Sequence, residues 1–195
     1  MSRDVKLLHP ELQIIVNQWK AECKKQGLNV LITQTFRTKA EQDALYAQGR
    51  TTKGNIVTNA KYPRSPHCWG VAFDFCRNVK GREYDDSDDF FAKVGAVGKK
   101  LGLTWGGDFK SFVDKPHLEM RKYMPNASTN HLLQTYGTPD AFRNSWQDES
   151  HPAYLLAKAG KINSPDYWFR VCRGFETVSP ANVQALLEKW ASDIK

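Results

Sequence analysis

Two short segments far apart in this chain carry side chains that suit one metal centre, so any fold must bring them together. The first, SPHCWGVAFD, covers residues 65–74, and the second, DKPH, covers residues 114–117. His67, Asp74 and His117 can supply two imidazole nitrogens and a carboxylate oxygen to a zinc ion. Three protein ligands leave the fourth tetrahedral position open for water, the arrangement of a catalytic zinc site. The spare carboxylate, Asp114, could accept a proton from that water.

The spacing of the first two ligands requires a bend in the chain. Residues seven apart on a straight strand point to opposite faces, so His67 and Asp74 converge only if residues 66–70 turn before the strand begins. Alternation along residues 71–76 then predicts one face with Ala72, Asp74 and Cys76, and an opposite apolar face with Val71, Phe73 and Phe75. Asp74 is therefore expected to point away from the core, as a ligand in a cleft must.

The pattern Ser-x-His-x-x-Gly-x-Ala-x-Asp, followed by Asp-x-x-His, resembles a family of zinc peptidases that cut peptidoglycan stem peptides. These are the VanY-type D-Ala-D-Ala carboxypeptidases and the related L-alanyl-D-glutamate endopeptidases, which are common as phage endolysins. Every fixed position of the double motif is filled, and the resemblance covers residues 6–121. The sequence of residues 36–38 (FRT) and 48–50 (QGR) is more similar to the endopeptidases than to the vancomycin-resistance dipeptidases.

The resemblance implies a role for several residues around the ligands. It places the catalytic carboxylate three residues before the last histidine, at Asp114, where some relatives have glutamate. Glu119 is the rival base, because on a strand it would share the face of His117; we expect it instead to support a ligand or to form a structural ion pair. Arg37, Gln42 and Ser65 match positions that bind substrate or stabilise the developing oxyanion in similar enzymes.

Each of these assignments has a plainer alternative. Arg37 could be a surface arginine that pairs with Asp43 or Glu41. Three aromatic residues could line the substrate groove or pack in the core: Trp69, Trp105 and Tyr46. Four acids resemble metal ligands but lack the spacing of a calcium loop, so a solvated loop and helix start explains them better: Asp85, Asp86, Asp88 and Asp89.

Periodicity and capping signals predict an α+β domain, a small antiparallel sheet flanked by helices. Helices are expected at 10–26, from the Thr38 capping box to residue 48, and from a Ser87 cap to residue 100. Strands are expected at 29–36, 71–76, 103–105 and 117–120. We expect a catalytic domain at 1–121 and a linker at 122–137.

Residues 138–195 have a different pattern. Ser, Thr or His precedes proline at 138–139, 151–152, 164–165 and 179–180, and three of these four pairs are good helix starts. The last segment carries Val183, Leu186, Leu187 and Trp190 on one helical stripe. We expect a small all-helical C-terminal unit that binds the cell wall or, alternatively, only packs on the catalytic domain.

Composition limits the partners and the compartment. The net charge of +7 suits anionic polymers, but no basic and aromatic block or nucleic-acid motif is present, so we expect no nucleic-acid partner. The four cysteines lack Cys-x-x-Cys spacing and are expected to be free thiols in a reducing cytoplasm. No apolar run approaches the roughly 20 residues of a membrane span, and no basic-then-apolar leader follows Met1. We expect a monomer without membrane insertion, made in the cytoplasm and released to the wall by a holin.

Taken with these limits, the resemblance implies a zinc endopeptidase that hydrolyses the L-Ala–D-Glu bond of the stem peptide and lyses bacterial cell walls. A D-Ala-D-Ala carboxypeptidase is the alternative within the same chemistry; it would need a blocked groove and a cation for the terminal carboxylate. A non-catalytic wall-binding module that retains zinc is an alternative of another class. Such a module would be expected to lose the base, whereas Asp114 is present.

Overall fold

The computed structural model describes residues 1–146 and 180–192, and its contacts divide the chain into two units, Met1–Trp146 and Gln147–Lys195. The division falls after Trp146, whereas the sequence placed a linker at 122–137 and the start of the tail at 138. Each unit is described by itself.

The first unit is built on a four-stranded antiparallel sheet with strand order β1-β2-β4-β3. The strands are β1 (Val30–Gln34), β2 (Ala72–Arg77), β3 (Thr104–Trp105) and β4 (His117–Glu119). All four lie within the ranges expected from the sequence, apart from Arg77 at the end of β2. The small antiparallel sheet flanked by helices confirms the α+β class.

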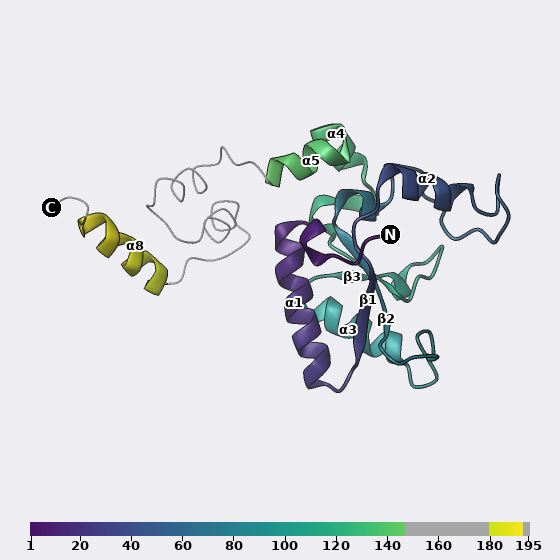
Figure 1. The fold of residues 1–195 in the computed structure, drawn as a ribbon, viewed down its shortest axis with the longest axis horizontal. Helices are drawn as coiled ribbons and strands as arrows, with labels where there is room; N and C mark the ends of the chain where they lie inside the picture. The colour runs from purple at the N-terminus through teal and green to yellow at the C-terminus, as the bar shows by residue number, and fades with distance from the viewer. Residues whose placement is uncertain (147–179, 193–195) are drawn as a thin grey trace. The chain divides into compact units, whose positions relative to one another are not determined.

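Helices α1 (Pro10–Lys25) and α3 (Phe90–Lys100) cover one face of the sheet (Figure 1). Trp19 of α1 lies 5.1 Å from Phe73 and 5.4 Å from Phe75 between ring centroids. Phe91 of α3 lies 5.6 Å from Phe75. The predicted apolar face of β2 is therefore confirmed, and Asp74 is left on the opposite face.

The starts of the other two predicted helices differ in how well the sequence located them. Helix α2 (Lys39–Ala47) begins at the predicted capping box, in which Thr38 and Glu41 satisfy each other's backbone amides. Helix α3 begins after Asp89, and the prediction of a cap at Ser87 is wrong. The amide of Ser87 instead donates to Asp85, and the amide of Phe91 donates to Asp86, so the acidic loop forms this helix start.

After β4 the chain forms α4 (Asn130–Tyr136) and α5 (Pro139–Trp146). The predicted cap before Pro139 is present, since the Thr138 hydroxyl accepts from the Ala141 amide at 3.1 Å. Phe142 packs against His9 and Trp69, and Trp146 packs against His9. These ring contacts explain why α5 belongs to the first unit.

The described part of the second unit is α8 (Pro180–Ser192), whose first residue is the proline of the last predicted pair; the cap predicted at residue 179 lies outside the described residues. Two residues of its predicted apolar stripe are exposed, Val183 by 40% and Leu187 by 54%. The helix starts predicted at 152 and 165 lie outside the described residues. Within the described ranges no helix is long and apolar enough to cross a membrane, and Cys23, Cys68 and Cys76 are buried free thiols.

Candidate metal centre

A cleft of about 550 Å³ opens on the sheet face opposite α1 and α3. Its floor is formed by side chains of β1, β2 and β4, and its rim by the loops around residues 57–60 and 109–114. Six of the site residues predicted from the sequence line it: Arg37, Ser65, His67, Asp74, Asp114 and His117.

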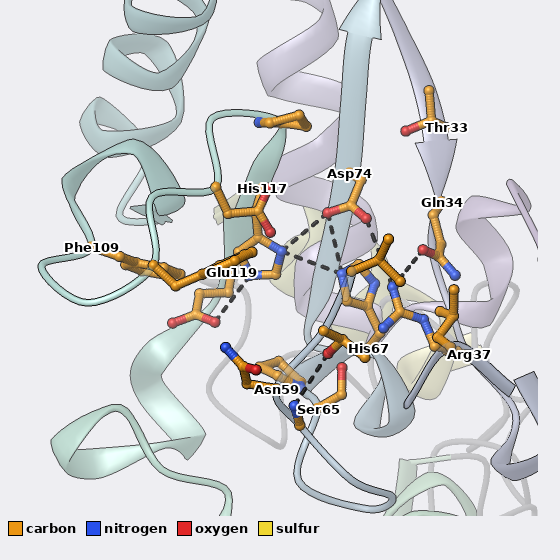
Figure 2. A pocket seen from close by; sticks show the side chains of 18 of the residues that line it. Thr33, Gln34, Arg37, Asn59, Ser65, His67, Asp74, Phe109, His117 and Glu119 are labelled. Atoms are coloured by element: carbon orange, nitrogen blue, oxygen red, sulfur yellow. Dashed lines mark hydrogen bonds and ion pairs between the residues drawn. The ribbon is translucent and has the colours of Figure 1, made fainter. Parts of the chain in front are cut away.

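His67, Asp74 and His117 meet in the middle of this cleft (Figure 2). His67 Nε2 lies 3.3 Å from His117 Nδ1. Asp74 Oδ1 lies 3.2 Å from the first nitrogen and 3.1 Å from the second. One ligand atom from each residue falls within 4.8 Å of the others, so the three can share one ion.

The predicted bend between the first two ligands is a 3₁₀ turn, η2 (Pro66–Trp69), that ends at Gly70. Gly70 has φ 67°, a left-handed conformation that favours glycine. A Cβ at this position would also lie 3.0 Å from the Leu7 carbonyl oxygen. The turn lets His67 face the same side as Asp74, which follows on β2.

Hydrogen bonds orient both imidazoles. His67 Nδ1 lies 2.8 Å from the Thr35 carbonyl oxygen, which can only accept, so this nitrogen carries the proton and Nε2 is free. His117 has the opposite arrangement: Nε2 lies 3.1 Å from Glu119 Oε2, and Nδ1 faces the other ligands. Partners of this kind fix the tautomer of metal-binding histidines.

Burial and neighbouring charges act in opposite directions on the pKa values of these groups. Burial alone would raise the pKa of the Asp74 carboxyl, but the charges and hydrogen bonds of His67 and His117 hold it far below its usual range. Burial alone would lower the pKa of His117, but hydrogen bonds to Asp74 and Glu119 raise it to about 10. Asp74 is therefore ionised, which is the form in which a carboxylate binds a cation.

The loop that carries Asp114 is fixed at its base. The Asp114 amide donates to the Gly106 carbonyl at 2.9 Å, and the His117 amide donates to the Asp114 carbonyl at 3.1 Å. A Cβ on Gly106 would lie 2.3 Å from that second carbonyl oxygen, so only glycine fits. Burial raises the pKa of the Asp114 carboxyl, which makes it a better proton acceptor.

Arg37 is buried beside the ligands rather than paired on the surface. Its Nη1 donates to Gln42 Oε1 at 2.8 Å, and its Nη2 donates to Gln34 Oε1 at 2.5 Å. Nη2 also lies 3.9 Å from Asp74 Oδ2. Desolvation lowers the pKa of the guanidinium. The alternative pairing with Asp43 or Glu41 is not formed, since Asp43 pairs with Lys39 and Glu41 with Thr38 and the Met1 amine.

Comparison with known proteins assigns this arrangement to a family. The family model for D-alanyl-D-alanine carboxypeptidase matches residues 58–120, which include all three proposed ligands and Asp114. The chain is 43% identical to the peptidoglycan L-alanyl-D-glutamate endopeptidase CwlK of Bacillus subtilis (strain 168) over 122 residues, 58% of this chain and 73% of that protein. The chain belongs to the peptidase family that this model describes, the family of peptidoglycan peptidases.

Two more distant similarities accompany that match. The L-alanyl-D-glutamate peptidase of Listeria phage A118 is 38% identical over 100 residues, 49% of this chain and 32% of the phage protein. The crystal structure of the L-Ala D-Glu endopeptidase ChiX of Serratia marcescens superimposes with a TM-score of 0.45 and 18% identity. That superposition covers 60% of this chain and 82% of ChiX.

Not every residue that the resemblance suggested faces the cleft of the peptidase. Gln42 is fully buried and joins Arg37 to the rim loop, because its Nε2 donates to the Ala60 carbonyl at 2.6 Å. It therefore holds Arg37 and the rim in place.

Trp69 and Trp105 belong to the core, and each indole donates to a backbone carbonyl. The acidic loop pairs with Arg77, Arg82 and Lys115.

Gln34 lines the cleft, and sequence reasoning missed it. A β-bulge between Ile32 and Gln34 shifts the register, so that Ile32 pairs with Phe75 and Gln34 pairs with Asp74. Without the bulge, strict alternation would place Gln34 opposite Phe73, on the core face. Bulges re-aim side chains in this way near functional sites, and no residue of the VLITQ segment signals one.

Proposed function

We propose that this peptidase is a zinc endopeptidase that hydrolyses the L-Ala–D-Glu bond of peptidoglycan stem peptides. The observation that carries the proposal is the convergence of His67, Asp74 and His117 in a cleft that Asp114 also lines. The names of the CwlK and phage A118 relatives support the choice of bond.

The residues of the centre fit zinc. Two imidazole nitrogens and one carboxylate oxygen form a donor set typical of catalytic zinc, and each imidazole has its remaining nitrogen occupied by an oxygen acceptor. A zinc ion held by His67, Asp74 and His117 would lower the pKa of a coordinated water and polarise the scissile carbonyl.

Asp114 and Arg37 supply the protein's own part of the chemistry. The Asp114 carboxylate has no hydrogen-bond partner among the described residues, so it is free to take the proton of the attacking water. It returns that proton to the nitrogen of the leaving amine as the amide C–N bond breaks. Arg37, fixed by Gln34 and Gln42, places positive charge where the carbonyl oxygen gains negative charge.

The charge of the cleft favours an endopeptidase over a carboxypeptidase. A carboxypeptidase needs a cation to bind the terminal carboxylate of its substrate. Arg37 is the only lysine or arginine among the described residues that line the cleft, and it is already held beside Asp74. The other cationic group of a described lining residue, the Met1 amine, is paired with Glu41 at 2.7 Å.

Mass spectrometry of digested peptidoglycan tests this proposal, because the new termini identify the bond. We expect fragments that end in L-Ala and matching peptides that begin with D-Glu, with Asp114→Asn protein as the inactive control. Release of D-Ala alone would show that the protein is a carboxypeptidase, and intact peptidoglycan with zinc-loaded protein would exclude both activities.

A further inference from the structure

Glu119 is a buried carboxylate between His117 and Arg121, and its position explains how His117 is held. Its Oε2 lies 3.1 Å from His117 Nε2, and its Oε1 accepts from Arg121 Nε at 2.6 Å. The side chain is 6% exposed, so its charge depends on these two partners.

The pairing of β4 with β2 determines where the Glu119 carboxylate lies. His117 and Glu119 lie two apart on β4, so their side chains share the cleft face. On β2 the residue paired with His117 is Asp74, and the residue paired with Glu119 is Ala72. Opposite residues have Cβ atoms about 4.5–5.5 Å apart, and the small Ala72 leaves room for the longer Glu119 side chain. The alanine of the sequence motif thus has a steric reason.

Arg121 is held in turn by a ring on the cleft rim. Its guanidinium lies 5.2 Å from the centroid of Phe109, and the Phe109 ring lies 5.9 Å from that of His117. Arg121, Glu119, His117 and Phe109 therefore form a closed set of contacts on one side of the metal centre. His67 has no such charged support, because its second nitrogen meets the neutral Thr35 carbonyl.

We propose that Glu119, held by Arg121, is a positioning residue that keeps the proton of His117 on Nε2 and so presents the Nδ1 lone pair to the metal. The inference rests on the proposed zinc site but adds a residue outside the ligand set. It also removes Glu119 from the role of base, since both of its carboxylate oxygens are already engaged by His117 and Arg121.

Zinc affinity, measured by competition with a chelator, tests the proposal on the full-length protein. Loss of such a supporting partner commonly lowers metal affinity by about 10–100-fold, and we expect Glu119→Gln to raise the zinc Kd by that factor. A glutamine can still accept from His117, but its amide group would turn two donors toward Arg121. Asp114→Asn is the matched control, and its zinc Kd should stay within about twofold of wild type.

Arg121 provides a second test that does not alter the buried carboxylate, because its side chain is 37% exposed. Arg121→Gln should raise the zinc Kd less than Glu119→Gln does, and Arg121→Lys, which keeps a charged donor, should restore part of the affinity. The visible absorption of the Co²⁺ forms should change with both Glu119→Gln and Arg121→Gln, because the orientation of one ligand changes.

The outcomes separate this proposal from the proposed function. Folded Glu119→Gln and Arg121→Gln proteins with wild-type zinc affinity would overturn the positioning role. If Glu119→Gln does not fold, the Arg121 pair decides by the same criterion. Wild-type protein that binds zinc tightly but leaves the L-Ala–D-Glu bond intact would overturn the proposed function alone. Wild-type protein that binds no zinc would overturn both.

Discussion

Three buried histidines of the first unit occupy two contrasting regions. His67 and His117 lie in the metal centre, where their ring nitrogens meet carboxylate and carbonyl oxygens. His9 lies in an aromatic cluster, with ring centroids 4.9 Å from Tyr123 and 5.0 Å from Trp146. Its Nδ1 accepts from the Glu11 amide and so caps α1. All three are at most 5% exposed. Burial of a histidine therefore does not by itself indicate chemistry; in the metal centre the signal is that two imidazoles converge on the Asp74 carboxylate.

The largest expected effect separates these two regions directly. His67→Ala and His117→Ala should each abolish zinc retention and peptide hydrolysis, because two ligands cannot replace three. His9→Ala should retain stoichiometric zinc and lose only stability. Elemental analysis of the purified proteins measures the metal. A folded His67→Ala or His117→Ala protein with one zinc per chain would contradict the ligand assignment.

Within the metal centre, a change of base should have a smaller effect than a change of ligand. Asp114→Asn should keep the zinc and the fold but lower turnover by about 10²–10⁴-fold, since an amide cannot accept the proton. Steady-state hydrolysis of a soluble stem peptide measures this loss. Asp108→Asn, which changes an exposed acid paired with Lys99, is the control and should stay near wild type. A greater loss in Glu119→Gln, with its zinc retained, would move the base to Glu119.

In the aromatic cluster the expected effect is on stability. Trp146→Ala removes a ring that packs on His9 and Phe142, and such deletions of buried rings cost about 3–5 kcal/mol of unfolding free energy. Denaturant unfolding measures the change. The zinc Kd of the folded variant should remain within about twofold of wild type. A large change in the zinc Kd would show that the two regions are coupled. Gly70 would be the point of contact, because a Cβ added there would lie 3.2 Å from the Trp146 ring.

The smallest expected effect concerns the second unit. We propose that residues 147–195 help the peptidase bind intact cell walls, so a chain that ends at Trp146 should hydrolyse soluble stem peptides at the wild-type rate but sediment less with walls. A chain that ends at Gly137 loses α5 and with it Phe142 and Trp146, so it should aggregate. If the chain that ends at Trp146 also aggregates or loses peptidase activity, the tail is structural and the binding role is wrong.

The sequence predicted that His67, Asp74 and His117 converge because the motif fixes both residue types and their spacing. It predicted the buried face of β2 because Phe73 and Phe75 alternate with Asp74. It could not place Gln34, since the bulge that turns this side chain depends on strand pairing between residues distant in sequence. The burial of Gln42 likewise arises from tertiary contacts with Arg37 and Ala60.

Helix α5 shows the same limit at the level of domains. Its cap and its proline predicted the helix start correctly, but no local sequence signal predicts which surface the apolar face of a helix will cover. Phe142 and Trp146 find their partners in His9 and Trp69, more than 70 residues earlier in the chain. The pattern of the tail therefore suggested a unit boundary before α5, whereas the contacts place it after Trp146.

The backbone contact between Gly106 and Asp114 fixes the position of Asp114 independently of the loop at the cleft rim. Residues 107–113 leave and rejoin the sheet at two backbone positions that hydrogen-bond to each other, and their tip is exposed, with Phe112 46% and Val113 57% accessible. Phe112 also lines the cleft. Because the base of the loop is closed without help from its tip, residues 110–113 can change in sequence while Asp114 stays in place, whereas Phe109 contacts Arg121 and His117. Residues 110–113 are accordingly a part of the cleft wall that can vary without rebuilding the reaction centre.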